Sequence, residues 1–545
     1  MLPQSPNELP VLAIVSGIST HLLFYRHGEW DLKSHVIVIS YICVTLGLVA
    51  LEYSAIVASD WILGRSNWAL DIVKYHVLGV YASMLLYRAA FHRLNRFPGP
   101  FLARLSNLYV TSLVAKKLQL YDVTEKLHMK YGDYVRVGPT ELSVRDPAAV
   151  KMIHSSQAKV SKGVWYTISE PRISLETDRN KKSHALRRKV WDQGFSAQAL
   201  RSYEPRVSHY ATQLVNAIDD RMGRPMNITQ WLNYFSFDVM GDLSFGKGFN
   251  MLKEGKDQHF LIQLRENMKV ISLGSYLVWF FPFFKNIPGL NAEYLKNVGW
   301  LAEQVDQRIK SPPEHTDLFS WLLRDFEKGP KTKHDYGNLV CDAELICVAG
   351  SDTTSAALTN ILFHLAKDNS LYQTLQAELD GLQDLSQDSL KKIKLLDAVT
   401  NEALRLHPVV PSGAQRLTPP EGVQIGDTYI PGNVMVRVPM HAVFRVSAQL
   451  DERAFARPNE FIPERWTTRP ELIRDSSAFF PFGGAPYLCA GKQLALMEIR
   501  RVIAEILTRY NISFPPDHSD EAFLDGKVDA FTLVPAPLKL IFRQR

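Results

Sequence analysis

The chain has 545 residues, 46% of them hydrophobic, so it is long and apolar enough to bury a large core. Its net charge of +6 is modest and spread along the chain, which argues against a nucleic-acid partner. The four cysteines show no CxxC spacing and no disulfide framework, so we expect no zinc site; they are Cys43, Cys341, Cys347 and Cys489.

Residues 1–95 are predicted to form a membrane anchor with up to three transmembrane segments. The apolar segments are Val11–Tyr25, Val36–Val57 and Ala69–Ala90. The second is long enough to cross a bilayer, for which about 20 residues suffice. No basic residue precedes the first, so it does not resemble a cleaved signal peptide. The alternative is one crossing, with the other two helices lying in the membrane interface.

Basic residues flank the apolar segments unevenly. Arg26 and Lys33 lie between the first and second segments, and Arg88, Arg93 and Arg96 follow the third. Because positively charged loops stay in the cytosol, this asymmetry predicts three crossings with the N-terminus in the lumen.

The globular part is predicted to begin at Arg96-Phe-Pro-Gly-Pro100, where two prolines break any helix. No linker divides the chain after it, so we expect one domain over residues 96–545. Within that domain, Tyr134–Val137 and Glu141–Val144 alternate around Gly138-Pro139 and predict a β-hairpin.

Residues 184–195 (HALRRKVWDQGF) are predicted to be helical, with His184 and Arg188 one turn apart on the same face. A solvated helix face is the alternative to a binding role. Further on, Ser275–Leu290 is densely aromatic around Pro282. Either a core segment or a surface dipping into a bilayer fits that composition.

A long helix is predicted over Asp335–Lys367, and it contains Ala349-Gly-Ser-Asp-Thr-Thr354. The Thr353 hydroxyl can reach the carbonyl of Ala349 four residues earlier, which bends a helix already weakened by Gly350. Asp352 and Thr353 then form an acid–hydroxyl pair able to relay protons to bound dioxygen.

Glu402 and Arg405 lie three residues apart on a predicted helix that ends at His407-Pro408. Their side chains point the same way and can bond each other or a shared partner. An ordinary surface pair is the alternative. The later segment Phe461–Trp466 reads FIPERW and includes Arg465.

Residues 480–491 read FPFGGAPYLCAG, and a helical pattern begins at Lys492. Cys489 therefore lies where a glycine-rich loop enters a helix, and the helix N-terminus favours a thiolate there. A buried thiolate is suited to ligate haem iron. The alternative is an inert buried cysteine.

This loop resembles the cysteine-ligand loop of the cytochrome P-450 family, Phe-x-x-Gly-x-Arg-x-Cys-x-Gly. Phe482, Cys489 and Gly491 match, whereas Ala485 and Tyr487 stand where the family usually has Gly and Arg. The AGSDTT, Glu402–Arg405 and PERW segments also match, in the family's order, within residues 96–540. The resemblance implies a cytochrome P-450 fold, mainly α with a small β region, preceded by transmembrane helices.

The resemblance also implies the roles of individual residues. Cys489 would ligate the iron of a haem b, and Asp352 and Thr353 would deliver protons. Arg465 would close a buried structural cluster with Glu402 and Arg405. The cofactor-binding residues would be His184, Arg188, Arg416, Phe482, Tyr487, Cys489 and Gly491.

A membrane-anchored monooxygenase follows from this resemblance, inserting one oxygen atom from O2 into an apolar substrate, with Val409, Val410 and Phe531 as pocket-lining candidates. Electrons would come from a separate NADPH-dependent reductase, since the chain shows no dinucleotide fingerprint. The anchor layout suggests fungal secondary metabolism, an endoplasmic reticulum membrane and a catalytic domain facing the cytosol. The alternatives are a reductase-independent isomerase or dehydratase, which Asp352-Thr353 argues against, and a haem-free membrane scaffold, which only Tyr487 supports.

Overall fold

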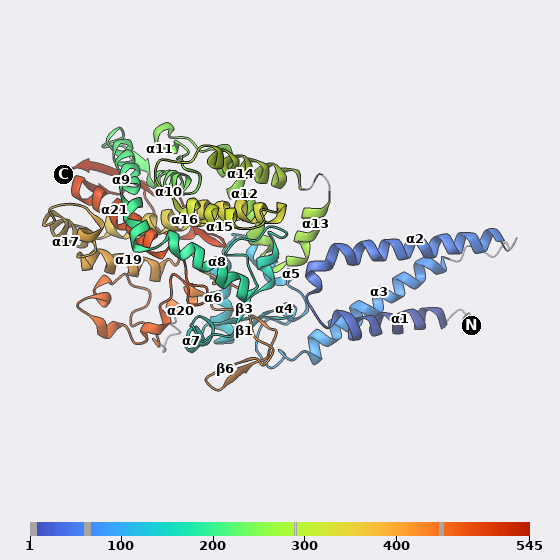
Figure 1. The fold of residues 1–545 in the computed structure, drawn as a ribbon. Coiled ribbons are helices and arrows are strands. Elements are labelled where there is room, and N and C mark those ends of the chain that lie inside the picture. Colours follow the sequence, from blue (N-terminus) through green and yellow to red (C-terminus); the bar gives the residue numbers. More distant parts are fainter. Residues whose placement is uncertain (1–7, 59–66, 288, 290, 446–451) are drawn as a thin grey trace. The chain divides into compact units, whose positions relative to one another are not determined.

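The computed structural model describes residues 8–58, 67–287, 289, 291–445 and 452–545 (Figure 1). The chain divides into two compact units. Unit 1 comprises residues 1–112, 136–141 and 274–293, and unit 2 comprises residues 113–135, 142–273 and 294–545. Unit 1 therefore contains the predicted anchor, residues 1–95, together with segments that follow it in the sequence.

Unit 1 contains the three long apolar helical stretches that the sequence predicts. They run over Glu8–Tyr25, Trp30–Ser54 and Trp68–Phe91, with mean hydropathies of 1.4, 2.2 and 1.3, and each is long enough to cross a membrane. Their principal helices are α1 (Glu8–Thr20), α2 (Ser34–Ala58) and α3 (Trp68–Leu86), followed by α4 (Phe101–Leu105) and α5 (Leu108–Val114).

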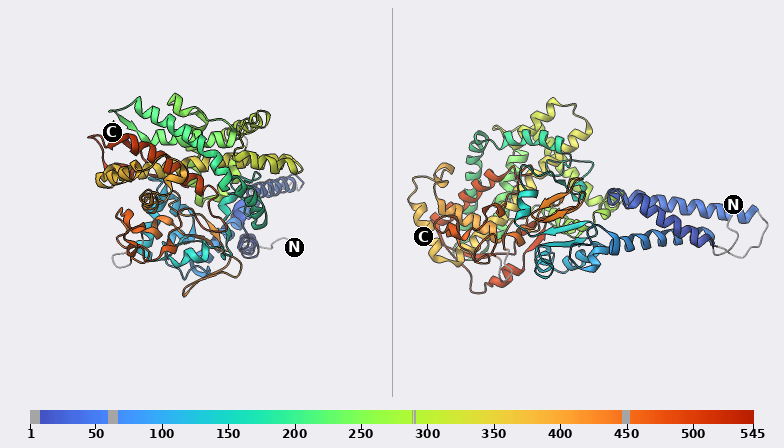
Figure 2. Two further views of the ribbon diagram at one scale, coloured as in Figure 1. Left: turned by 60° about the vertical axis from the view of Figure 1, so that its left-hand side comes forward. Right: turned by 90° about the horizontal axis from the view of Figure 1, so that it is seen from below.

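Helices α1 and α3 pack closely through glycines. A Cβ added at Gly17 would lie 2.0 Å from the carbonyl oxygen of His76, and one at Gly79 would lie 2.3 Å from a backbone oxygen of α1. His76 also lies within hydrogen-bonding distance of both other helices, 3.1 Å from Ser16 Oγ and 3.0 Å from Tyr41 Oη. The three blue helices of Figure 2 therefore form one packed bundle rather than separate helices.

The aromatic segment of unit 1 contacts the beginning of α2. It consists of η5 (Gly274–Tyr276), η6 (Val278–Phe280) and α13 (Phe281–Asn286). The Ser34 hydroxyl donates to the carbonyl oxygen of Trp279 at 2.6 Å. The side chains of Trp279 and Phe280 remain about two-fifths exposed, at 39% and 41%. These two rings therefore do not belong to a plain core.

Unit 2 is mainly helical. Its helices are α6 (Leu120–Tyr131), α7 (Ala148–Ile153), α8 (Lys181–Gly194), α9 (Ala197–Asp219), α10 (Ile228–Phe245), α11 (Met251–Glu254), α12 (His259–Leu273), α14 (Ala292–Lys310), α15 (Leu318–Lys328), α16 (Lys333–Lys367), α17 (Asn369–Asp380), α18 (Gln387–Leu390), α19 (Lys394–Leu406), α20 (Met440–Phe444), α21 (Lys492–Arg509) and α22 (Asp520–Asp525). Helix α16 confirms the predicted long helix, and a capping box between Thr332 and Asp335 begins it.

The small β region confirms the predicted fold class. One sheet has the order β1 (Tyr134–Gly138), β2 (Glu141–Val144), β8 (Met435–Arg437), β5 (Arg416–Leu417) and β3 (Ser161–Lys162), so the predicted hairpin is present. A second sheet has the order β4 (Pro225–Asn227), β12 (Lys539–Gln544) and β9 (Tyr510–Ser513). Two further hairpins are β6 (Val423–Ile425) with β7 (Thr428–Ile430), and β10 (Val528–Ala530) with β11 (Thr532–Val534).

The core of unit 2 forms where α10, α16 and α21 pack together with α9 and α19. At Gly350 of α16, an added Cβ would lie 2.5 Å from Cε of Met240 on α10. The absence of a side chain at Gly350 therefore lets Met240 pack directly against the backbone of α16. Helix α16, which contains the AGSDTT segment, also packs against α21, the helix that follows Cys489.

Candidate functional site

The loop before α21 is held by its own backbone. The N–H of Cys489 donates to the carbonyl oxygen of Phe482 at 3.0 Å, and that of Tyr487 donates to Gly484 at 3.0 Å. Gly483 has a φ of +71°, in the left-handed region that favours glycine. The loop ends at Gly491, the N-cap of α21. Cys489 is therefore fixed at the predicted loop-to-helix junction.

Cys489 is exposed, although enough protein surrounds its thiol to change its pKa. Burial raises the pKa of this thiol, while the backbone N–H of Gly491 and the charge of Arg188 act to lower it. The free thiol is therefore protonated near neutral pH. A coordinating metal cation deprotonates such a thiol, so the donor fits a metal ligand.

His184 and Arg188 lie on α8 as predicted, but they point to different partners. The ring of His184 packs edge-on against Tyr487, with centroids 4.9 Å apart. Arg188 instead donates from Nε to Asp192 at 2.6 Å and from its guanidinium to the carbonyl oxygen of Leu488. Burial and the charge of Lys162 lower the pKa of His184 to about 4, so its imidazole is neutral.

Arg416 lies on β5 beside Tyr487, with the guanidinium carbon 4.8 Å from the ring centroid. It donates to the hydroxyl of Tyr166 at 3.3 Å and to the carbonyl oxygen of Gln415 at 3.0 Å. Lys162, on the paired strand β3, also lies over the Tyr487 ring at 4.9 Å. No sequence pattern marks Lys162, because only the pairing of β3 with β5 places it beside Arg416.

The residues around Cys489 fit a haem. Such a group offers an iron that needs a ligand and two propionate carboxylates that need donors. Nε of Arg416 and the hydroxyl of Tyr487 are buried and have no hydrogen-bond partner among the residues that the structure describes. Buried polar groups require partners, so these two donors suit an anionic ligand. Cys489 would hold the iron, with Arg416, Tyr487 and His184 near the propionates.

The proton-relay candidates lie on α16. Thr353 Oγ1 donates to the carbonyl oxygen of Ala349 at 2.7 Å, which is the local bond expected from the sequence. Ser351 makes the same type of bond to Cys347 at 2.6 Å. Asp352 is partly exposed in this turn of the helix. Ser351 and Thr353, on either side of Asp352, therefore both bond the helix backbone through their hydroxyl groups.

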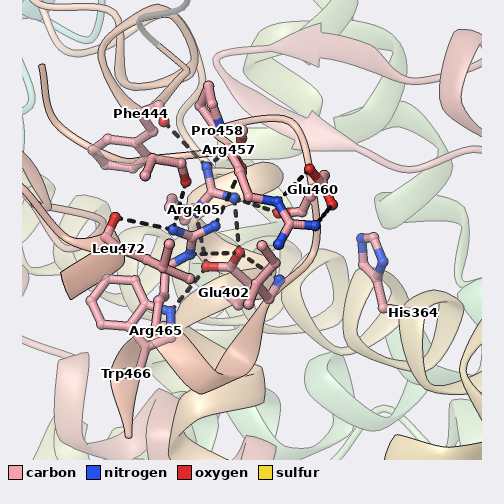
Figure 3. A network of polar contacts seen from close by, with 12 residues as sticks. His364, Glu402, Arg405, Phe444, Arg457, Pro458, Glu460, Arg465, Trp466 and Leu472 are labelled. Carbon is pink, nitrogen blue, oxygen red and sulfur yellow. Dashed lines mark hydrogen bonds and ion pairs between the residues drawn. The ribbon is translucent and has the colours of Figure 1, made fainter. Parts of the chain in front are cut away.

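The structure brings Glu402, Arg405 and Arg465 together as a fully buried cluster (Figure 3). Glu402 accepts from Nε of Arg405 at 2.9 Å and from Nε of Arg465 at 3.0 Å. It also accepts from the backbone N–H of Ile462 and from Nε1 of Trp466. The two guanidinium groups donate to backbone carbonyls around them, so the charges are compensated and solvated by the protein.

Three comparisons place the chain among known proteins. The family model described as "Cytochrome P450" matches residues 98–542. The cytochrome P450 monooxygenase orf5 of Eupenicillium brefeldianum is 48% identical over 87% of this chain and 96% of its own. FCK2 of Fusarium pseudograminearum, also a cytochrome P450 monooxygenase, is 44% identical over 98% of this chain and 97% of its own. Tryprostatin B 6-hydroxylase of Aspergillus fumigatus is 34% identical over 95% of this chain and 93% of its own.

A solved structure supports the fold. The crystal structure of a cytochrome P450 matches with a TM-score of 0.64 and 20% identity, over 78% of this chain and 94% of that chain.

Removing one member of the buried cluster should destabilise the protein strongly. Glu402→Gln leaves two buried arginines without their carboxylate, for which we expect a loss of about 3–5 kcal/mol in the free energy of unfolding. The matched control is Glu460→Gln, which removes the exposed partner of Arg457 and should have little effect. Urea unfolding of both variants measures the difference. Equal stabilities would show that the cluster contributes no more than a surface pair.

The same cluster predicts a pH dependence. Burial acts to raise the pKa of Glu402, but the bonds and charges of Arg405 and Arg465 outweigh it and hold the pKa below its usual range. The cluster therefore contributes its full stabilisation above the unfolded-state pKa and loses it as pH falls through the folded-state pKa.

Proposed function

The chain belongs to the cytochrome P450 family of haem-thiolate monooxygenases, and from that premise we propose that Cys489 ligates the haem iron and that the enzyme oxidises an apolar organic substrate. The observation that carries this proposal is the exposed Cys489 in the loop that enters α21. In the same loop Tyr487 packs on the buried Arg416, and the Tyr487 hydroxyl and Nε of Arg416 have no hydrogen-bond partner among the described residues. The relatives named as monooxygenases, and the one named as a hydroxylase, support the reaction class.

The bound haem supplies the activation of dioxygen that lets one oxygen atom enter the substrate. The protein contributes the surroundings. Cys489, deprotonated on binding, would hold the iron and donate electron density to it. Arg416, His184 and Tyr487 would orient the cofactor through its carboxylates. Phe482 and Gly491 shape the loop on either side of the ligand, and Arg188 holds the carbonyl of Leu488 next to it.

Asp352 and Thr353 are proposed to deliver protons. Thr353 Oγ1 carries its proton toward the carbonyl of Ala349, and the hydroxyl can pass a proton on when it turns from that acceptor. The partly exposed carboxyl group of Asp352 is the acid that reloads it. This assignment is supported by their position on a helix that packs against α21.

P450 monooxygenases take electrons from a redox partner and act on organic substrates. For this chain we propose an NADPH-dependent reductase that docks on the cysteine side, and a role in fungal secondary metabolism. The pathway proposal is supported by the fungal relatives, one of which is named for hydroxylating tryprostatin B. Asp352 and Thr353 argue against the isomerase or dehydratase alternative, and the haem-free alternative rests on Tyr487 alone.

The chain is proposed to be anchored in the endoplasmic reticulum by three crossings, with a lumenal N-terminus and a cytosolic catalytic domain. The close packing of α1 on α3 and the bonds of His76 to both other helices support a three-helix bundle over one span with two interfacial helices.

Cys489→Ser should abolish the thiolate-type spectrum of the reduced, CO-bound protein and all turnover, because an alcohol cannot replace the thiolate donor. The control is Cys43→Ser, which changes an exposed cysteine of α2. The absorption spectra of the purified variants give the answer. Retention of the thiolate spectrum in Cys489→Ser would identify another ligand.

Thr353→Ala should leave NADPH consumption with a reductase largely intact but divert it to hydrogen peroxide, since protons no longer reach the oxygen in the right order. The matched control is Thr359→Ala, which removes a buried hydroxyl with the same bond to the carbonyl four residues earlier. Product formed per NADPH is the quantity to compare. An unchanged ratio in Thr353→Ala would place the relay elsewhere.

A glycosylation tag inserted before Pro10 should be modified in microsomes, because the proposed topology places it in the lumen. Protease added from outside should cut the catalytic domain but leave the tag protected. An unmodified tag that the protease reaches would mean that the first apolar segment does not cross the membrane.

A further inference from the structure

Two buried cations face each other on neighbouring strands of unit 2. The antiparallel register pairs Lys162 of β3 with Arg416 of β5. Their side chains belong to residues that are only 3% and 5% exposed. Burying a cation is costly unless an anion or several hydrogen bonds compensate it, so two together require an explanation.

The ring of Tyr487 contacts both cations. Nζ of Lys162 lies 4.9 Å from the ring centroid, and the guanidinium carbon of Arg416 lies 4.8 Å from it. Such contacts are favourable, because the face of an aromatic ring carries negative charge. Tyr487 therefore brings the two cations together two residues before Cys489, although it carries no charge of its own.

The hydrogen bonds of these cations go to neutral oxygens. Lys162 donates to the carbonyl oxygen of Leu175 at 2.8 Å, and Arg416 donates to Gln415 and Tyr166. Nε of Arg416 keeps no partner among the described residues. Two carboxyl groups act on Lys162. The pKa of Glu176 is raised by burial although Lys162 and Arg416 act to lower it, and Asp178 already lies 3.7 Å from Nε of Arg187. Burial nevertheless lowers the pKa of Lys162 to about 7, so these carboxyl groups do not fully compensate its charge and the paired cations suit a further anion.

We propose that Lys162 is a haem-binding residue, which with Arg416 holds the propionate carboxylates and supplies the positive charge that the tyrosine at position 487 does not. This inference rests on the proposed role of Cys489. A lysine and an arginine give charge-assisted hydrogen bonds to carboxylates, about twice as strong as neutral ones. The alternative is that Lys162 is only the structural partner of Glu176.

The test compares full-length Lys162→Gln with Lys162→Arg and with the control Lys182→Gln, which changes an exposed lysine of α8. Haem per protein and the rate of haem transfer to apomyoglobin are the readouts, and circular dichroism checks the fold. We expect Lys162→Gln to lose haem at least about tenfold faster than the control, and Lys162→Arg to retain it. Equal rates in Lys162→Gln and the control would overturn the inference.

A second pair of variants separates haem binding from a structural ion pair. If Lys162 binds the haem, Glu176→Gln keeps haem and the double variant with Lys162→Gln loses it as fast as Lys162→Gln alone. Recovery of haem retention in the double variant would show that Lys162 only neutralises Glu176.

Adding Tyr487→Arg to Lys162→Gln should restore haem retention, because it returns a cation to the site beside Arg416. If the unmodified protein shows no thiolate-type CO spectrum, the proposed ligand role of Cys489 is wrong. If the spectrum is normal and Lys162→Gln retains its haem, only the role of Lys162 is wrong.

Discussion

A carboxylate without exposed surface, Glu402, links the helical part of unit 2 to the loop that carries the thiol. It can stay charged only because Arg405 and Arg465 surround it, and these arginines bind backbone carbonyls from residues 456–472. Nε1 of Trp466 bonds the same carboxylate, and its ring packs on Phe479 with centroids 4.5 Å apart. The cysteine loop begins one residue later. The buried charge cluster thus determines where that loop starts.

Local features of the site could be predicted from the sequence. The bond from Thr353 to Ala349 spans four residues of one helix, and Glu402 and Arg405 share one helix face, so helical geometry suffices for both. The place of Cys489 follows from a glycine-rich loop and the helical pattern after it. The three apolar helices of the anchor follow from hydropathy.

Features that depend on distant parts of the chain could not be predicted. Lys162 faces Arg416 because of the register between two two-residue strands, which carry no sequence pattern of their own. Helical spacing places Arg188 on the same face as His184 but does not determine that it turns toward Leu488. The contact between Ser34 and Trp279 likewise joins segments that only the tertiary fold brings together.

The contact between Gly350 and Met240 has a consequence for protein engineering. Any side chain at position 350 would meet the thioether of Met240 within 3 Å, so the two positions share a single volume. Position 350 also lies two residues before Asp352, the residue proposed to deliver protons. With position 350 varied alone, a small side chain would require the flexible end of Met240 to move, and a large one would overpack the core. Varying both positions together, with a smaller residue at 240, would keep the volume constant and give access to new shapes of this helix.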